Sequence, residues 1–109
     1  MIRAVIYHDT HGKIKGFRVE GHAGYSAAGQ DIVCSAVSAI VFTALGGLDE
    51  LAGFKNYTEQ DGFIECYVPD SLGETESYIT DVILKTMEIG LRQIEADYGE
   101  YIRIRYEEV

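Results

Sequence analysis

The sequence predicts an α+β fold in which an antiparallel or mixed sheet carries two helices on one of its faces. Runs of strand-forming residues alternate with two long amphipathic runs, in the order ββαββαβ. Turn-forming residues separate the two pairs of consecutive strands, as expected for hairpins. The 109 residues are enough for one hydrophobic core and too few for two. We therefore expect a single domain over residues 1–109, built as a two-layer sandwich.

The first two strands are expected at residues 2–8 and 14–20, because both segments are rich in strand-forming side chains. Residues 9–13 between them have the composition of a turn, so the two strands form a hairpin. Residues 21–30 follow, with three glycines, three alanines and a serine. Such a segment has little intrinsic order, and we expect a mobile loop at the wall of an active site.

Each predicted helix has a start signal, a stop signal and an apolar stripe. Asp31 is the expected N-cap of the first helix, which Gly53 ends. Ser71 and Glu74 predict a capping box for the second helix, which Gly99 ends. The expected core-facing stripes are Val33, Val37, Ile40, Val41, Ala44 and Leu48 in the first helix, and Ile79, Val82, Ile83, Met87, Leu91, Ile94 and Tyr98 in the second.

The remaining strands form a second hairpin and one late strand. Asp61-Gly62, the strongest short hairpin signal in the chain, joins predicted strands at residues 57–60 and 63–68. Residues 101–106 alternate isoleucine with arginine, which is typical of a half-buried strand. The edges of such a sheet need cover, and a homodimer would provide it.

Composition narrows the class of protein. A net charge of −9 argues against a nucleic-acid binder and suits a basic partner. The longest apolar run, residues 36–48, is too short to cross a bilayer, so we expect a buried helix and no membrane partner. The chain enters a strand pattern at residue 2 without a signal-peptide pattern. We therefore expect a cytoplasmic protein whose two cysteines are reduced.

A histidine and a cysteine stand twelve positions apart across the glycine-rich loop. His22 follows the second strand directly, and Cys34 falls at N3, in the first turn of the first helix. A helix N-terminus and a nearby imidazole both favour the nucleophilic thiolate over the thiol. Because the loop returns the chain to the start of the helix, the two side chains can meet. This pattern indicates a cysteine hydrolase.

The other candidate ligands and nucleophiles are weaker. Cys66 shares a strand face with apolar neighbours, so we expect a buried, inert thiol. Asp31 either caps the helix or orients His22 as a third catalytic residue, and we favour the cap. A metal site could draw on at most three ligands, namely Cys34, His22 and Asp31, and these lack paired spacing, so we expect no metal and no cofactor.

The chain contains Gly21-His22-Ala23-Gly24-Tyr25, followed by Gly29-Gln30-Asp31-Ile32-Val33-Cys34-Ser35-Ala36-Val37-Ser38. This signature closely resembles that of the Prp family of bacterial ribosomal-processing cysteine proteases, and the resemblance extends over essentially the whole chain. It implies a homodimeric endopeptidase that removes a short N-terminal extension from a large-subunit ribosomal protein, protein twenty-seven in bacteria. It also implies His22 as general base and acid and Cys34 as nucleophile.

The roles that the resemblance implies for the other signature residues are less direct. Asp31 and Ser38 match supporting positions, and the loop residues expected to gate the substrate are Gly21, Gly24, Tyr25 and Gly29. The implied chemistry is acyl transfer, in which the backbone N–H groups of residues 33–35 are expected to stabilise the oxyanion. The partner would be the N-terminal peptide of a basic ribosomal protein, bound without a cofactor.

Two other classes of function stay open at this point. The acidic surface could belong to a non-enzymatic module that binds a basic ribosomal protein, with an incidental cysteine. The glycine-rich turn before a helix could instead hold an anion or a nucleotide, although the chain has no G-x-G-x-x-G or Walker spacing and no lysine accompanies the turn. A catalytic role for Cys34 distinguishes the protease from both.

Overall fold

A computed structural model describes residues 1–27 and 29–109 of the chain. The predicted order ββαββαβ is confirmed. The elements are β1 (Ile2–His8), β2 (Ile14–Glu20), α1 (Ile32–Ala52), β3 (Tyr57–Gln60), β4 (Phe63–Tyr67), α2 (Glu74–Tyr98) and β5 (Ile102–Glu108).

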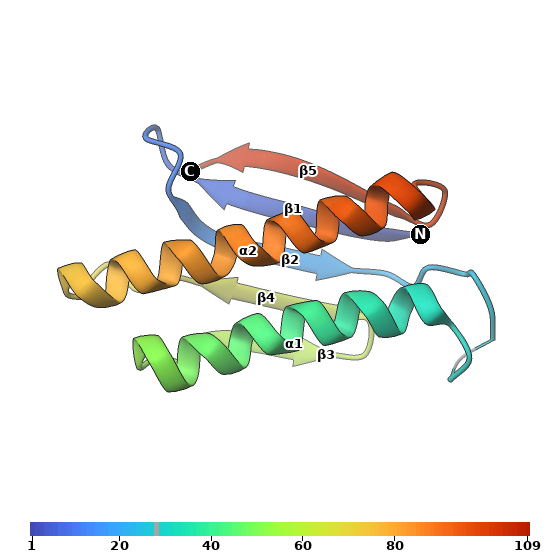
Figure 1. Cartoon of the computed structure of the whole chain (residues 1–109), viewed down its shortest axis with the longest axis horizontal. Helices are drawn as coiled ribbons and strands as arrows, with labels where there is room; N and C mark the ends of the chain where they lie inside the picture. Colours follow the sequence, from blue (N-terminus) through green and yellow to red (C-terminus); the bar gives the residue numbers. More distant parts are fainter. Residues whose placement is uncertain (28) are drawn as a thin grey trace.

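The five strands form one mixed sheet in the order β3-β4-β2-β1-β5. β1 pairs antiparallel with β2 and parallel with β5, and β4 lies antiparallel between β2 and β3. Both helices lie side by side on one face of this sheet (Figure 1). The predicted α+β class is therefore confirmed. Because β4 pairs with β2, the β3–β4 turn reaches the end of β2 where the glycine-rich loop begins.

The core lies between the sheet and the two helices. α1 contributes the stripe that its spacing predicts, apart from Ile40, which is only half-buried. α1 is longer than the apolar run within it, and by length and composition alone it could cross a membrane. Its inner stripe packs on the sheet, so it is a core helix as predicted, although the expectation that its apolar segment is too short was wrong. The buried residues of α1 are Val33, Val37, Val41, Ala44, Leu45, Leu48 and Ala52.

α2 begins later than the sequence predicts. Its N-cap is Gly73, which makes no side-chain cap hydrogen bond, so the capping box at Ser71 and Glu74 was wrong. A Cβ on residue 73 would lie 2.5 Å from a carboxylate oxygen of Glu76. A glycine at position 73 therefore leaves room for the Glu76 side chain. Glu74 and Glu76 lie in the first turn, at the positive end of the helix dipole, where negative charge is favourable. This electrostatic stabilisation takes the place of the expected cap.

The buried stripe of α2 also differs from the predicted one. Thr80 and Leu84 are buried, whereas Val82 is 47% exposed. Thr80 fits the core because its hydroxyl donates to the Glu76 carbonyl at 2.8 Å. α2 packs against α1 as well as the sheet, with Ile83 lying over Gly47. The face that the helix buries is therefore rotated from the one that spacing alone indicates.

One sheet edge is covered within the chain. β5 is an edge strand, and its Ile104 N–H donates to a Glu95 carboxylate oxygen of α2 at 2.8 Å. An edge donor that is already paired is poorly placed to accept another strand. We expected the sheet edges to need cover, and α2 thus covers part of the β5 edge.

Candidate active site

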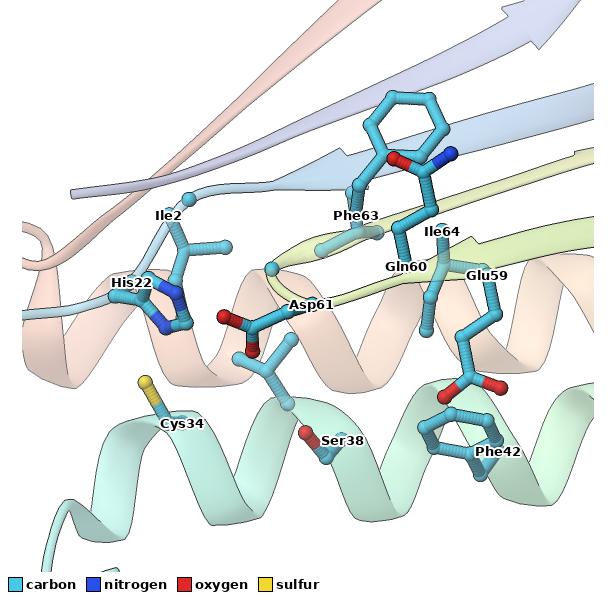
Figure 2. Close-up of a pocket in the computed structure, with 14 residues that line it drawn as sticks. Ile2, His22, Cys34, Ser38, Phe42, Glu59, Gln60, Asp61, Phe63 and Ile64 are labelled. Carbon is cyan, nitrogen blue, oxygen red and sulfur yellow. The ribbon is translucent and has the colours of Figure 1, made fainter. Parts of the chain in front are cut away.

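A cavity of about 440 Å³ lies where the first turns of α1 face the β3–β4 turn. Figure 2 shows the Cys34 thiol on α1 pointing toward the His22 ring, with the Asp61 carboxylate across the cavity from Ser38. The structure therefore brings His22, Cys34 and Ser38 to one cavity. Its lining residues are Ile2, Val19, Gly21, His22, Cys34, Val37, Ser38, Phe42, Glu59, Gln60, Asp61, Gly62, Phe63 and Ile64.

Cys34 is the third residue of α1, as predicted, and is partly buried. The Ala23 N–H donates to its sulfur at 3.3 Å. A backbone donor is thus aimed at the sulfur, which lies in the first turn of a 21-residue helix. The donor comes from the glycine-rich loop, which the sequence could not place at this atom. The thiol is therefore accessible from the cavity and has a backbone donor beside it.

Asp31 is the N-cap of α1, as predicted. One of its carboxylate oxygens accepts the N–H groups of Val33 and Cys34, each at 3.0 Å. The other accepts the N–H groups of Tyr25 at 3.0 Å and Ser26 at 3.3 Å. These hydrogen bonds, that from Cys34 foremost, lower the pKa of Asp31. The carboxylate thus ties the loop to the helix and makes no hydrogen bond to His22 within the described residues.

The paired N–H groups overturn one expectation about the oxyanion. The N–H groups of Val33 and Cys34 donate to the Asp31 side chain, and that of Ser35 donates to the Asp31 carbonyl at 3.0 Å. None of the three is free to stabilise a tetrahedral intermediate, so their assignment as oxyanion donors was wrong. The same carboxylate occupies the helix N-terminus where a phosphate would bind. The structure therefore gives no support to an anion or nucleotide site at this turn.

His22 stands against the β3–β4 turn. The preceding Gly21 N–H donates to the Gly62 carbonyl at 2.9 Å. Gly62 has φ +68°, and a Cβ there would lie 2.8 Å from His22 Nε2. The glycine therefore supplies a left-handed turn and the space for the imidazole. No hydrogen bond joins His22 to Cys34 in the described part of the chain, a common arrangement before substrate binds.

We expect Gly62→Ala to lower kcat/KM by about tenfold or more, because the methyl group displaces the imidazole and small misplacements are costly. Gly12→Ala is the matched control, since Gly12 also has positive φ (+81°) and a Cβ there would meet no atom within 4 Å. It carries similar backbone strain and should leave kcat/KM unchanged. Peptide-cleavage kinetics of both variants check the prediction, and equal losses would contradict it.

The predicted loop residues fall into different places. Gly21 lines the cavity, and a Cβ on it would lie 2.4 Å from the Met1 carbonyl oxygen. Tyr25 lies elsewhere, with its ring edge-on to Tyr98 and Tyr101 at centroid distances of 5.8 and 5.1 Å. Gly24 and Gly29 both have positive φ. Residue 28 of the predicted mobile loop lies outside the described residues, and the mobility of the loop stays a prediction.

Sequence reasoning did not single out the β3–β4 turn as part of the site. Glu59, Asp61 and Gly62 all line the cavity. Asp61-Gly62 was identified only as a hairpin signal, and its approach to His22 depends on the pairing of β4 with β2. A sequence does not reveal that strand order, so no local signal could have found these residues.

Cys66 is fully buried on β4, as predicted, and burial raises the pKa of its thiol to about 12. The thiol therefore stays protonated at neutral pH. We expect iodoacetamide at about pH 7.5 to alkylate Cys34 alone in the folded protein, because the thiolate is the reactive form. Peptide mapping by mass spectrometry checks this. Modification of Cys66 before unfolding, or no modification at Cys34, would contradict it.

Among residues 1–27 and 29–109, no three or more histidine, cysteine or acidic side chains gather in a way that could hold a metal ion. The catalytic cavity brings together a thiol, an imidazole and a nearby backbone donor. Such a set can carry out nucleophilic acyl transfer.

Comparison with known proteins identifies the family of the chain. A family model described as cysteine protease Prp matches residues 1–103. The ribosomal processing cysteine protease Prp of Bacillus subtilis (strain 168) is 33% identical over 107 residues, covering 95% of this chain and 96% of the relative. The essential ribosomal processing protease Prp from S. aureus has been crystallised with a covalently linked product peptide. That structure matches with a TM-score of 0.88 and 29% identity over 98% of this chain and 100% of the other.

A second structure of the S. aureus protease, in complex with a substrate peptide, matches with a TM-score of 0.81 and 28% identity, covering 98% of this chain and 100% of the other. The family match and the identity to the B. subtilis relative both extend over nearly the whole chain. This chain belongs to the cysteine protease Prp family.

Proposed function

We propose that this chain is a cytoplasmic endopeptidase that removes the N-terminal extension of large-subunit ribosomal protein twenty-seven during ribosome assembly. Cys34 and His22 form its catalytic dyad. The observation that carries the proposal is the Cys34 thiol at the start of α1, which accepts the Ala23 N–H and points toward His22 in one cavity. The relatives are ribosomal processing proteases, and the S. aureus protein binds peptide.

The proposed reaction has two halves. The Cys34 thiolate attacks the scissile carbonyl carbon, and the peptide C–N bond breaks as protonated His22 gives its proton to the leaving amine. A thioester then links the Cys34 sulfur to the carbonyl carbon of the N-terminal extension, while the mature protein leaves as the amine. Neutral His22 next takes a proton from water, the hydroxide adds to the thioester, and the carbon–sulfur bond breaks. The products are a carboxylate, an amine and the regenerated enzyme.

The charge of the cavity supports a basic substrate. Glu59 and Asp61 line it, and its lining contains no lysine or arginine among the described residues, in a chain of net charge −9. A basic ribosomal protein would be attracted to this surface, and the attraction would weaken as the salt concentration rises.

In the proposed enzyme Asp31 is a positioning residue, because its carboxylate ties the glycine-rich loop to α1. Ser38 lies one turn beyond Cys34 on the cavity wall, where a bound peptide would pass.

Cleavage of the ribosomal protein in its extended form tests the proposal. The purified chain is incubated with that protein, and the intact masses of the products are measured. We expect one cut that releases the extension and leaves the mature protein whole. A ribosomal protein that already lacks the extension is the control and should stay uncut. Saturable binding without any cut would instead support a non-enzymatic binding module and would overturn the protease.

We also propose that two copies associate through the outer faces of α1 and α2. A groove of about 610 Å³ runs between these helices, and none of the residues that line it in the described part of the chain is charged. Only 33% of the most apolar window of α1 is buried within one copy. An uncharged apolar face lets two chains of like net charge approach, and burying it is favourable. This supports the homodimer that the family resemblance implies.

Introducing a charge into this groove should separate the copies. Ile89 lines the groove and is 49% exposed, so we expect Ile89→Glu to convert the dimer to a monomer. Tyr78 is 71% exposed on the same helix but does not line the groove, and Tyr78→Glu is the matched control. Light scattering after size-exclusion chromatography measures the mass of each. A dimer that survives Ile89→Glu would rule out this face.

A further inference from the structure

Four of the five arginines of the chain lie on β1, β2 and β5 and alternate with buried residues that face the core. They therefore lie on the sheet face opposite the one that the helices cover (Figure 1). They line a hollow of about 530 Å³ together with Met1, Ala4, Val5 and Glu20. This cluster lies on β1, β2 and β5, away from the catalytic cavity. We call it the arginine face, and its members are Arg3, Arg18, Arg103 and Arg105.

The strand register places these side chains next to one another. Arg3 of β1 pairs directly with Arg103 of β5, and Val5 of β1 stands between Arg105 and Arg18 on its two neighbouring strands. Like charges opposite each other on adjacent strands destabilise a sheet. The chain has 18 acidic residues, so carboxylates that could neutralise such a pair are plentiful. The arrangement therefore points away from a purely structural role.

Most of this positive charge is left unpaired. Arg18 lies 3.6 Å from a Glu20 carboxylate oxygen and 4.0 Å from one of Glu65. Its buried Nε has no hydrogen-bond partner within the described residues. Arg3, Arg103 and Arg105 are exposed and form no ion pair in the same part of the chain. Three free guanidinium groups and one partly paired group thus border the same hollow.

The size and surroundings of the arginine face define its ligand. It extends across three strands, or about 10 Å. The guanidinium group pairs with phosphate oxygens through two parallel hydrogen bonds. A long polyanion would extend beyond the cluster onto the surface of a chain with net charge −9, which repels it. A di- or triphosphate concentrates several charges within the span of the hollow.

We propose that the arginine face binds a compact polyphosphate, either free or as the phosphate chain of a nucleotide. The site is independent of peptide cleavage, because its arginines do not line the catalytic cavity. In the ligand-free protein the clustered positive charge is unfavourable. A bound polyphosphate neutralises it, so binding should also raise the melting temperature.

Isothermal titration of the full chain in about 50 mM salt tests this, with inorganic tripolyphosphate, ATP and orthophosphate as probes. We expect one tripolyphosphate per chain and orthophosphate binding at least about tenfold weaker. Arg103→Gln and Arg105→Gln should each weaken tripolyphosphate binding about tenfold. Arg92, the fifth arginine, lies on α2, and Arg92→Gln is the matched control that should bind like the parent chain.

The probes also separate the two sources of the ligand. ATP binding tighter than tripolyphosphate would identify a nucleotide, and equal affinities would identify the phosphate chain alone. No saturable binding, or an equal loss in Arg92→Gln, would overturn the proposal. A single-stranded RNA of about twenty nucleotides that binds more tightly than tripolyphosphate would overturn it too, because it would indicate a polymer. Arg103→Gln and Arg105→Gln should keep the peptide cleavage and the far-UV circular dichroism of the parent chain. The circular dichroism spectrum shows that the variants fold.

Discussion

Replacing Cys34 by serine is expected to lower kcat/KM for the extended ribosomal protein by on the order of 10⁴-fold or more. The serine hydroxyl is nearly the same size as the thiol but stays protonated at neutral pH, so the nucleophile is lost while the packing is kept. The Ala23 N–H can still donate to an oxygen at this position. Cleavage followed by mass spectrometry measures the loss, and circular dichroism shows whether the fold is kept.

Cys66→Ala is the matched control for that substitution. Cys66 is fully buried on β4 and does not line the catalytic cavity. The variant should therefore lose some stability through a small cavity in the core, while it retains kcat/KM within about twofold. Cleavage that persists in Cys34→Ser or Cys34→Ala would remove the proposed nucleophile, whatever the behaviour of the control.

Removing the imidazole should have the second largest effect. We expect His22→Ala to lower kcat/KM for a peptide by on the order of 10³-fold, because general acid–base catalysis of amide cleavage is lost. The rate at which a p-nitrophenyl ester acylates Cys34 should decrease far less, because p-nitrophenolate leaves without needing a proton. A burst of p-nitrophenol followed by slow turnover would show that the thioester forms and then persists.

His11→Ala is the control for the imidazole. His11 lies in the exposed turn between β1 and β2, at the end of the hairpin far from His22. Its removal should leave both the peptide and the ester reaction unchanged. If His22→Ala loses the ester burst together with peptide cleavage, His22 maintains the structure around the thiol. That outcome would contradict its role as general acid and base.

Much of the fold follows from local patterns. Alternating strands, the Asp61-Gly62 turn and the Asp31 cap gave every element within a few residues, because each depends on neighbours in the sequence. The start of α2 and its buried face did not follow. They depend on the Glu76 carboxylate folding back over Gly73 and on contacts between the two helices. Such contacts are long-range or too small in energy to appear in a pattern.

The site was predictable to a similar degree. The spacing of His22 and Cys34 indicated the chemistry, because the loop between them has to return to the helix. The hydrogen bond from Ala23 to the sulfur and the pairing of the Val33 and Cys34 N–H groups with Asp31 were not predictable. Both depend on the three-dimensional path of the glycine-rich loop, which residue types alone do not define.

The two chain ends lie at opposite ends of the sheet, which matters for preparing this protein. Ile2 lines the catalytic cavity, whereas the Val109 N–H donates to the His8 carbonyl at the far end of β1 (Figure 1). An affinity tag fused ahead of Met1 would start one residue before Ile2 and so next to the catalytic cavity, where it could be cut or could block entry. A tag fused after Val109 would avoid both problems.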